Sequence, residues 1–171
     1  MNLETYQRGL QSLISQGHCD AFDAPYLRGL IGSPRLAVVN EVIRFWRLQT
    51  LERFCVLTAG LLKRRGRFEQ DVARFLRSGE FSPFIEEAGQ QFLRFMAADA
   101  DATVAALAHT ELALHATRTD PRREQVVDWP CEPENVLAQA LGRADVASPA
   151  PGRYRMRIGR ALPSGYQCER L

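Results

Sequence analysis

Three histidines are the first candidates for chemistry in this chain of 171 residues: His18, His109 and His115. His109 and His115 lie six residues apart in one expected helix, which turns them about 120° away from each other at 3.6 residues per turn. Two ligands of one metal ion on a helix need a spacing of three or four residues, so this pair is badly placed to share an ion. Glu111 and His115 do have that spacing, which suits an ion pair or a hydrogen bond, and we interpret their role as structural or interfacial.

The cysteines show no pattern of a reactive or metal-binding site. No two of the four are close enough to form a CxxC pair, so neither zinc nor a disulfide framework is indicated. A thiolate activated by His18 at Cys19 is disfavoured, because adjacent loop residues usually point apart and no third group orients them. We therefore predict no catalytic residue, no metal ligand and no cofactor in this chain. The four cysteines are Cys19, Cys55, Cys131 and Cys168.

A basic cluster offers the best argument for nucleic-acid binding. Lys63, Arg64, Arg65 and Arg67 place four positive charges within five residues, which can bind phosphates. A DNA-binding transcriptional regulator is therefore the alternative function. Residues 1–120 nevertheless hold 14 basic and 14 acidic side chains. Without a larger positive field around the cluster, we favour a solvated helix end that offsets the helix dipole, and we expect no nucleic acid among the partners.

A second arginine-rich segment near the end of the chain has the alternation of a β-strand. Arg153, Arg155 and Arg157 would lie on one face and the residues between them on the other, so that one face can be buried. A peptide that pairs with such a strand gains main-chain hydrogen bonds, while the arginines favour an acidic peptide. The alternative, that the apolar residues anchor a hairpin and the arginines are solvated, stays open beside it. The predicted peptide-binding residues are Arg153, Tyr154, Arg155, Met156, Arg157 and Ile158.

The elements that must position these residues are mainly helical. Apolar residues recur at spacings of three and four up to Asp120-Pro121, and short strand-like runs follow. The sequence predicts a bundle of about five to six helices with a small C-terminal β-hairpin or three-stranded module. We divide it into a helical partner-docking domain, 1–120, and a small α/β module for peptide capture, 121–171. The expected helices cover 3–15, a short piece at 26–30, 35–54 with its apolar pattern continuing over 55–62, 68–76, 82–96, a last long helix from 99 or 101 to 118, and 133–141. The expected strands cover 125–129, 153–160 and 166–171.

The start of the chain and its hydropathy predict a cytoplasmic protein without a membrane segment. The first six residues lack a basic start followed by an apolar stretch, as a signal peptide would have. No apolar run approaches the roughly 18 residues that cross a bilayer.

Several blocks between residues 30 and 118 resemble a helical family long labelled as DNA-binding, which includes HvfC and the methanobactin biosynthesis protein MbnC. In place of the tyrosine and paired asparagines of HvfC-like members, this chain has Val39, Asn40, Glu41 and Val42, which favours the MbnC-like branch. The blocks are Arg35–Asn40, Leu51–Phe54, Phe68–Leu76, Ser82–Ile85 with Gly89, Phe92 and Leu93, and Leu107–Ala116.

The resemblance implies a partner rather than an enzyme. Family members like MbnC accompany a TIM-barrel multinuclear non-haem iron oxidase, and the pair converts cysteines of a ribosomal precursor peptide to copper-chelating oxazolone and thioamide groups. The iron belongs to the barrel subunit. The resemblance therefore implies a non-catalytic subunit of a heterodimer that binds a cysteine-containing precursor through its C-terminal module.

Overall fold

The computed structural model describes residues 3–16, 29–78, 81–162 and 164–171, and it divides into two compact units. The first comprises Met1–Gln49 and the second Thr50–Leu171. The expected division at Asp120-Pro121 thus falls inside the second unit, where helices and strands pack together. The helix expected around residues 26–30 falls largely outside the described residues. No helix within the described ranges is long and apolar enough to cross a membrane.

The first unit contains helix α1, Leu3–Gln16, and most of helix α3, Pro34–Phe54. A serine and a proline start α3 as the sequence predicts: the Ser33 hydroxyl accepts the Leu36 amide at 3.4 Å, and Pro34 occupies the first helical position. Large apolar side chains of α3 nevertheless remain exposed, and we call them the α3 stripe: Val38, Val39, Val42, Phe45 and Trp46.

The second unit continues with four helices: α4, Val56–Arg64; α5, Phe68–Ser78; α6, Ile85–Met96; and α7, Ala102–Thr119. Gly66 makes the turn between α4 and α5 with φ of +67°, a conformation that favours glycine. Asp101 caps α7 by accepting the amides of Thr103 and Val104. α6 starts at Ile85, later than Ser82-Pro83 suggests. The Ser82 hydroxyl accepts the Phe84 amide and donates to the Glu87 carboxylate, so Ser82 lies outside the helix and bonds to its first turn.

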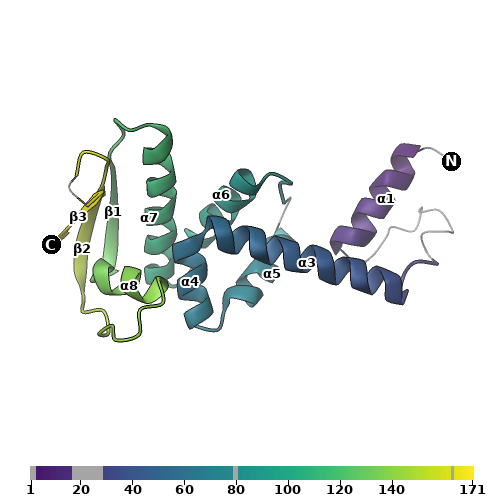
Figure 1. The fold of residues 1–171 in the computed structure, drawn as a ribbon, viewed down its shortest axis with the longest axis horizontal. Helices are drawn as coiled ribbons and strands as arrows, with labels where there is room; N and C mark the ends of the chain where they lie inside the picture. Colours follow the sequence, from purple (N-terminus) through teal and green to yellow (C-terminus); the bar gives the residue numbers. More distant parts are fainter. Residues whose placement is uncertain (1–2, 17–28, 79–80, 163) are drawn as a thin grey trace. The chain divides into compact units, whose positions relative to one another are not determined.

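The C-terminal part of the second unit is a three-stranded antiparallel sheet in the order β1-β2-β3 (Figure 1). Its strands are β1, Gln125–Cys131; β2, Pro151–Ile158; and β3, Tyr166–Arg170, with helix α8, Pro133–Ala140, after β1. β2 begins at Pro151, two residues before the expected strand at 153–160, because the chain pairs with β1 from Pro151 onwards.

One face of the sheet completes the core of the second unit. α7 packs against both β1 and β2, and Figure 1 shows it running alongside β1. The side chains that this face buries alternate along each strand, as the pleat requires. They are Val127, Trp129, Met156 and Ile158. The prediction of a mainly α fold with a small C-terminal β module is confirmed.

Candidate functional site

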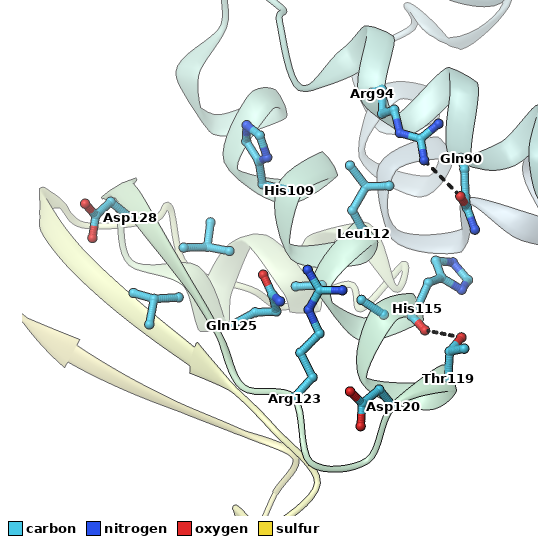
Figure 2. A pocket seen from close by; sticks show the side chains of 14 residues that line it. Gln90, Arg94, His109, Leu112, His115, Thr119, Asp120, Arg123, Gln125 and Asp128 are labelled. Atoms are coloured by element: carbon cyan, nitrogen blue, oxygen red, sulfur yellow. Dashed lines mark hydrogen bonds between the residues drawn. The ribbon is translucent and has the colours of Figure 1, made fainter.

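A groove of about 670 Å³ runs between α7 and β1, entirely within the second unit (Figure 2). α7 forms one wall and β1 the other. Two residues of α6 and the turn between α7 and β1 complete the lining. The lining residues are Gln90, Arg94, His109, Leu112, Ala113, His115, Ala116, Thr119, Asp120, Arg123, Gln125, Val126, Val127 and Asp128.

Within the part of the chain that the structure describes, no strand pairs with the outer edge of β1, and the hydrogen-bond pattern of β2 shows which β1 residues face that edge. Leu171 N donates to Arg153 O at 2.8 Å and Gly159 N to Gly165 O at 3.0 Å, so alternate residues from Arg153 onwards direct their backbone groups toward β3. The intervening residues, Tyr154, Met156 and Ile158, direct theirs toward β1.

The β1 residues opposite those three are Trp129, Val127 and Gln125. Their amides and carbonyls are therefore used within the sheet. The residues between them, Val126 and Asp128, turn their backbone groups to the other side, where the groove lies. At the next such position, Pro130 has no N–H to donate. The free edge of β1 therefore offers a short hydrogen-bonding ladder that ends at Pro130.

The α7 wall combines small and polar side chains. Leu112, Ala113 and Ala116 lie at helical spacing on the side of α7 that lines the groove, with His109 at one end. Ala113 is buried, whereas His109 is exposed. Short alanine side chains leave room between the helix and the strand edge, so that a further extended segment could lie beside β1.

A second side of α7, which adjoins the groove at His115, fixes the junction between α3 and α4. Both carboxylate oxygens of Glu111 accept backbone amides at the start of α4, from Leu57 and Thr58, each at 2.9 Å. The His115 ring stacks on Phe54, with ring centroids 4.2 Å apart. Glu111 and His115 thus contact separate partners at this junction, in place of the mutual pair that their spacing allowed.

Burial shifts the ionisation of both side chains. It raises the pKa of Glu111 above the ordinary carboxyl value, although the two amide bonds and Arg118 oppose the shift. Burial, together with nearby Arg118, lowers the pKa of His115, opposed by a hydrogen bond to the Phe54 backbone and by Glu86. The groove wall at His115 is accordingly biased toward a neutral ring.

The six predicted peptide-binding residues lie in β2, the middle strand. Both sides of β2 are occupied, by β1 and by β3, so no peptide can pair with it as an added strand. Met156 and Ile158 are buried, in keeping with the anchoring alternative. Whether any of the six contacts a peptide stays a prediction; strand addition requires an edge, β1 or β3.

Two of the three strand arginines already have acidic partners on the exposed face of the sheet. Arg155 Nε lies 2.9 Å from Asp128 Oδ1, and Arg157 Nη2 lies 2.9 Å from Glu124 Oε2. These pairs weaken the argument that β2 attracts an acidic peptide by its own charge.

The basic cluster at the α4–α5 turn is also paired. Lys63 contacts Glu52, Arg65 contacts Asp101, and the Arg64 side chain donates to a backbone carbonyl. Arg67 lies 3.1 Å from the buried Asp99 carboxylate. The cluster therefore links elements of the second unit, and no contact seen here favours the DNA-binding alternative.

Within the described ranges, no three His, Cys, Asp or Glu side chains gather as a metal site would require. Burial raises the pKa of Cys55, and it raises that of Cys168 to about 11. His18 and Cys19 fall outside the described residues.

Comparison with known proteins gives no relative: no protein-family model, curated protein or solved structure matches the chain.

The sequence assigned peptide pairing to the strand that the sheet places in the middle, β2, whereas the edge beside the groove belongs to β1. The groove is lined by three residues that the sequence did not single out, Arg123, Val126 and Asp128. Asp120 to Glu124 form a very short connection between a helix and a strand, which forces the two to lie side by side. The short connection could therefore have predicted that α7 and β1 border a common groove. It could not have predicted that β1 pairs with β2, which decides which edge of the sheet is free.

Proposed function

We propose that this chain is the peptide-binding, non-catalytic subunit of a two-protein assembly. Its partner is a TIM-barrel multinuclear non-haem iron oxidase, and its ligand is a ribosomal precursor peptide whose cysteines become oxazolone and thioamide groups. The partner and the chemistry rest on the resemblance of residues 30–118, with iron held by the partner. The observation that carries peptide binding is the free edge of β1 beside the groove.

The β1 edge supports binding by strand addition, in which an extended peptide becomes a fourth strand. Val126 and Asp128 each offer one N–H and one C=O, so up to four backbone hydrogen bonds can form. Each is worth about 0.5–1.5 kcal/mol net, and ordering the peptide offsets part of that sum. Contacts with the α7 wall must supply the rest. The edge of β3 is the other place for an added strand, but it does not line this groove.

Replacing Val126 by proline tests the peptide site. Val126→Pro removes an N–H that faces the groove but keeps the β1–β2 bonds, because Val126 does not bond to β2. We expect roughly tenfold weaker binding of a cysteine-containing precursor peptide, measured by fluorescence anisotropy. Val126→Thr keeps the N–H and serves as the control. Unchanged affinity in a Val126→Pro variant that melts like the wild type would contradict binding at β1.

The α3 stripe is the proposed contact with the oxidase. Trp46 is 61% exposed and Phe45 55%, and their rings lie 6.1 Å apart. A contiguous exposed apolar patch of this kind is typical of a protein–protein interface, where aromatic side chains contribute most.

Charge insertion tests that contact. Trp46→Glu should abolish co-elution with a barrel-type iron oxidase in size-exclusion chromatography, since it buries an unpaired carboxylate in the interface. Peptide affinity should not change. Ile85→Glu, at another exposed apolar position, is the matched control. If Trp46→Glu co-elutes like the wild type, the oxidase does not bind at the α3 stripe.

A further inference from the structure

We infer that the groove selects an extended peptide with a carboxylate side chain directed toward α7, and that Arg123 is the residue that recognises it. This inference rests on the proposed function, because it specifies the peptide that the edge of β1 would hold. It concerns the side chains of the peptide, whereas strand addition concerns its backbone.

Arg123 is positioned for this role by the turn between α7 and β1. Its amide donates to Asp120 O at 3.1 Å, which holds the turn, and Figure 2 shows its side chain reaching from there into the groove. The residue is exposed. A guanidinium offers several N–H donors in one plane, which suits bidentate binding of a carboxylate.

The charges around Arg123 favour an anionic ligand. Arg94 adds a second cation at the rim, held by a 3.1 Å hydrogen bond to Gln90. The groove contains two carboxylates, but Asp128 is paired with Arg155 at 2.9 Å. The other carboxylate, Asp120, accepts the Arg122 amide at 3.1 Å and supplies the negative charge at the turn. Among the described residues that line the groove, there are therefore two arginines and one carboxylate, Asp120, without an ion-pair partner.

The alternation of an added strand explains how one side chain would meet Arg123. Side chains of a strand paired with β1 point in turn toward α7 and toward the opposite face. Those directed to α7 meet the small side chains of Ala113 and Ala116, which line the same groove as Arg123. The groove therefore favours small or apolar residues at the positions facing α7 and a Glu or Asp at the one nearest Arg123.

Three probe peptides test the inference: nine residues of alternating Thr and Val, with Glu, Gln or Lys at the centre. For the full chain we expect the Glu peptide to bind roughly fivefold more tightly than the Gln peptide, and the Lys peptide most weakly, by fluorescence anisotropy. That ratio corresponds to about 1 kcal/mol, typical of an exposed charge pair. Arg123→Gln should remove the preference, and Arg123→Glu should reverse it. Arg77→Gln, an exposed arginine of α5, should change nothing.

The outcomes separate this inference from the proposed function. If Val126→Pro weakens all three peptides equally but the wild type shows no preference for Glu, strand addition stands and carboxylate selection is wrong. A preference for Glu that persists in Arg123→Gln would overturn the role of Arg123. If the wild-type protein binds neither the three probe peptides nor the precursor peptide, the proposed function itself fails.

Discussion

Glu111 shows how a single side chain can hold several elements in place. The start of a helix leaves backbone amides without partners, and Glu111 satisfies two of them at α4 from the neighbouring helix α7. The residue that directly precedes α4, Cys55, has no side-chain hydrogen bond to a capping amide. Its thiol instead contacts Gly89 O at 3.5 Å. Glu111 therefore performs the capping role that the local sequence of α4 does not supply.

Removing the Glu111 carboxylate should destabilise the second unit. Glu111→Ala leaves two amides unpaired, the buried one of Thr58 and the part-buried one of Leu57. We expect the free energy of unfolding to fall by roughly 2–4 kcal/mol at pH 7 in urea titrations. Glu111→Gln, the control, keeps one acceptor and should cost less. An Ala variant as stable as the wild type would show that water replaces the carboxylate without penalty.

The contribution of Glu111 to stability should also depend on pH, in the direction that its burial sets. Burial raises the pKa of Glu111 in the folded protein, whereas an unfolded chain has a carboxyl pKa of about 4.3. The stabilising contribution of Glu111 is therefore complete below the unfolded value and declines as pH rises through the folded pKa. The stability difference between wild type and Glu111→Ala should accordingly be larger near pH 4 than at pH 7. A difference that grows with pH would mean that the two amide bonds outweigh burial.

At the scale of elements, the junction of α3, α6 and α7 is organised around Phe54. The Phe54 ring stacks on His115 of α7 and passes over Gly89 of α6, where a Cβ atom would overlap the ring. Glycine within a helix normally costs about 1 kcal/mol relative to alanine. Here the close approach of the aromatic ring explains its presence.

Gly89→Ala should therefore lower the stability of the protein, whereas the same substitution within an ordinary helix raises it. We expect destabilisation by roughly 1–3 kcal/mol in thermal or urea unfolding, since the ring must move. The double variant Gly89→Ala with Phe54→Ala should be less destabilised than the sum of the single variants, because the overlap is gone. Stabilisation by Gly89→Ala alone would show that the ring adapts freely.

Elements were predictable from the sequence where local signals determine them. Helix periodicity, the Asp101 cap and the turn at Gly66 act within a few residues, and the corresponding helices lie close to their expected ranges. Long-range pairing was not predictable. Nothing near Arg155 or Arg67 in the chain reveals their partners Asp128 and Asp99, which lie 27 and 32 residues away. For the same reason, the strand that would occupy the middle of the sheet could not be chosen from alternation alone.

At the scale of the whole molecule, the two proposed contacts lie in different units of the chain. The α3 stripe lies in the first unit and the groove in the second. A subunit that bound an oxidase at one and a peptide at the other could bring the peptide to the iron without chemistry of its own. The two contacts are separable by mutation, since Trp46→Glu should affect only the first and Val126→Pro only the second.

Amide hydrogen exchange, followed by NMR on the isotopically labelled protein with and without the precursor peptide, tests strand addition most directly. Binding at the free edge of β1 should slow exchange at Val126 and Asp128, because their amides acquire partners. The outward-facing amides of β3, such as that of Cys168, should not change. Protection at Cys168 without protection at Val126 and Asp128 would place the peptide on the other edge and contradict the assigned groove.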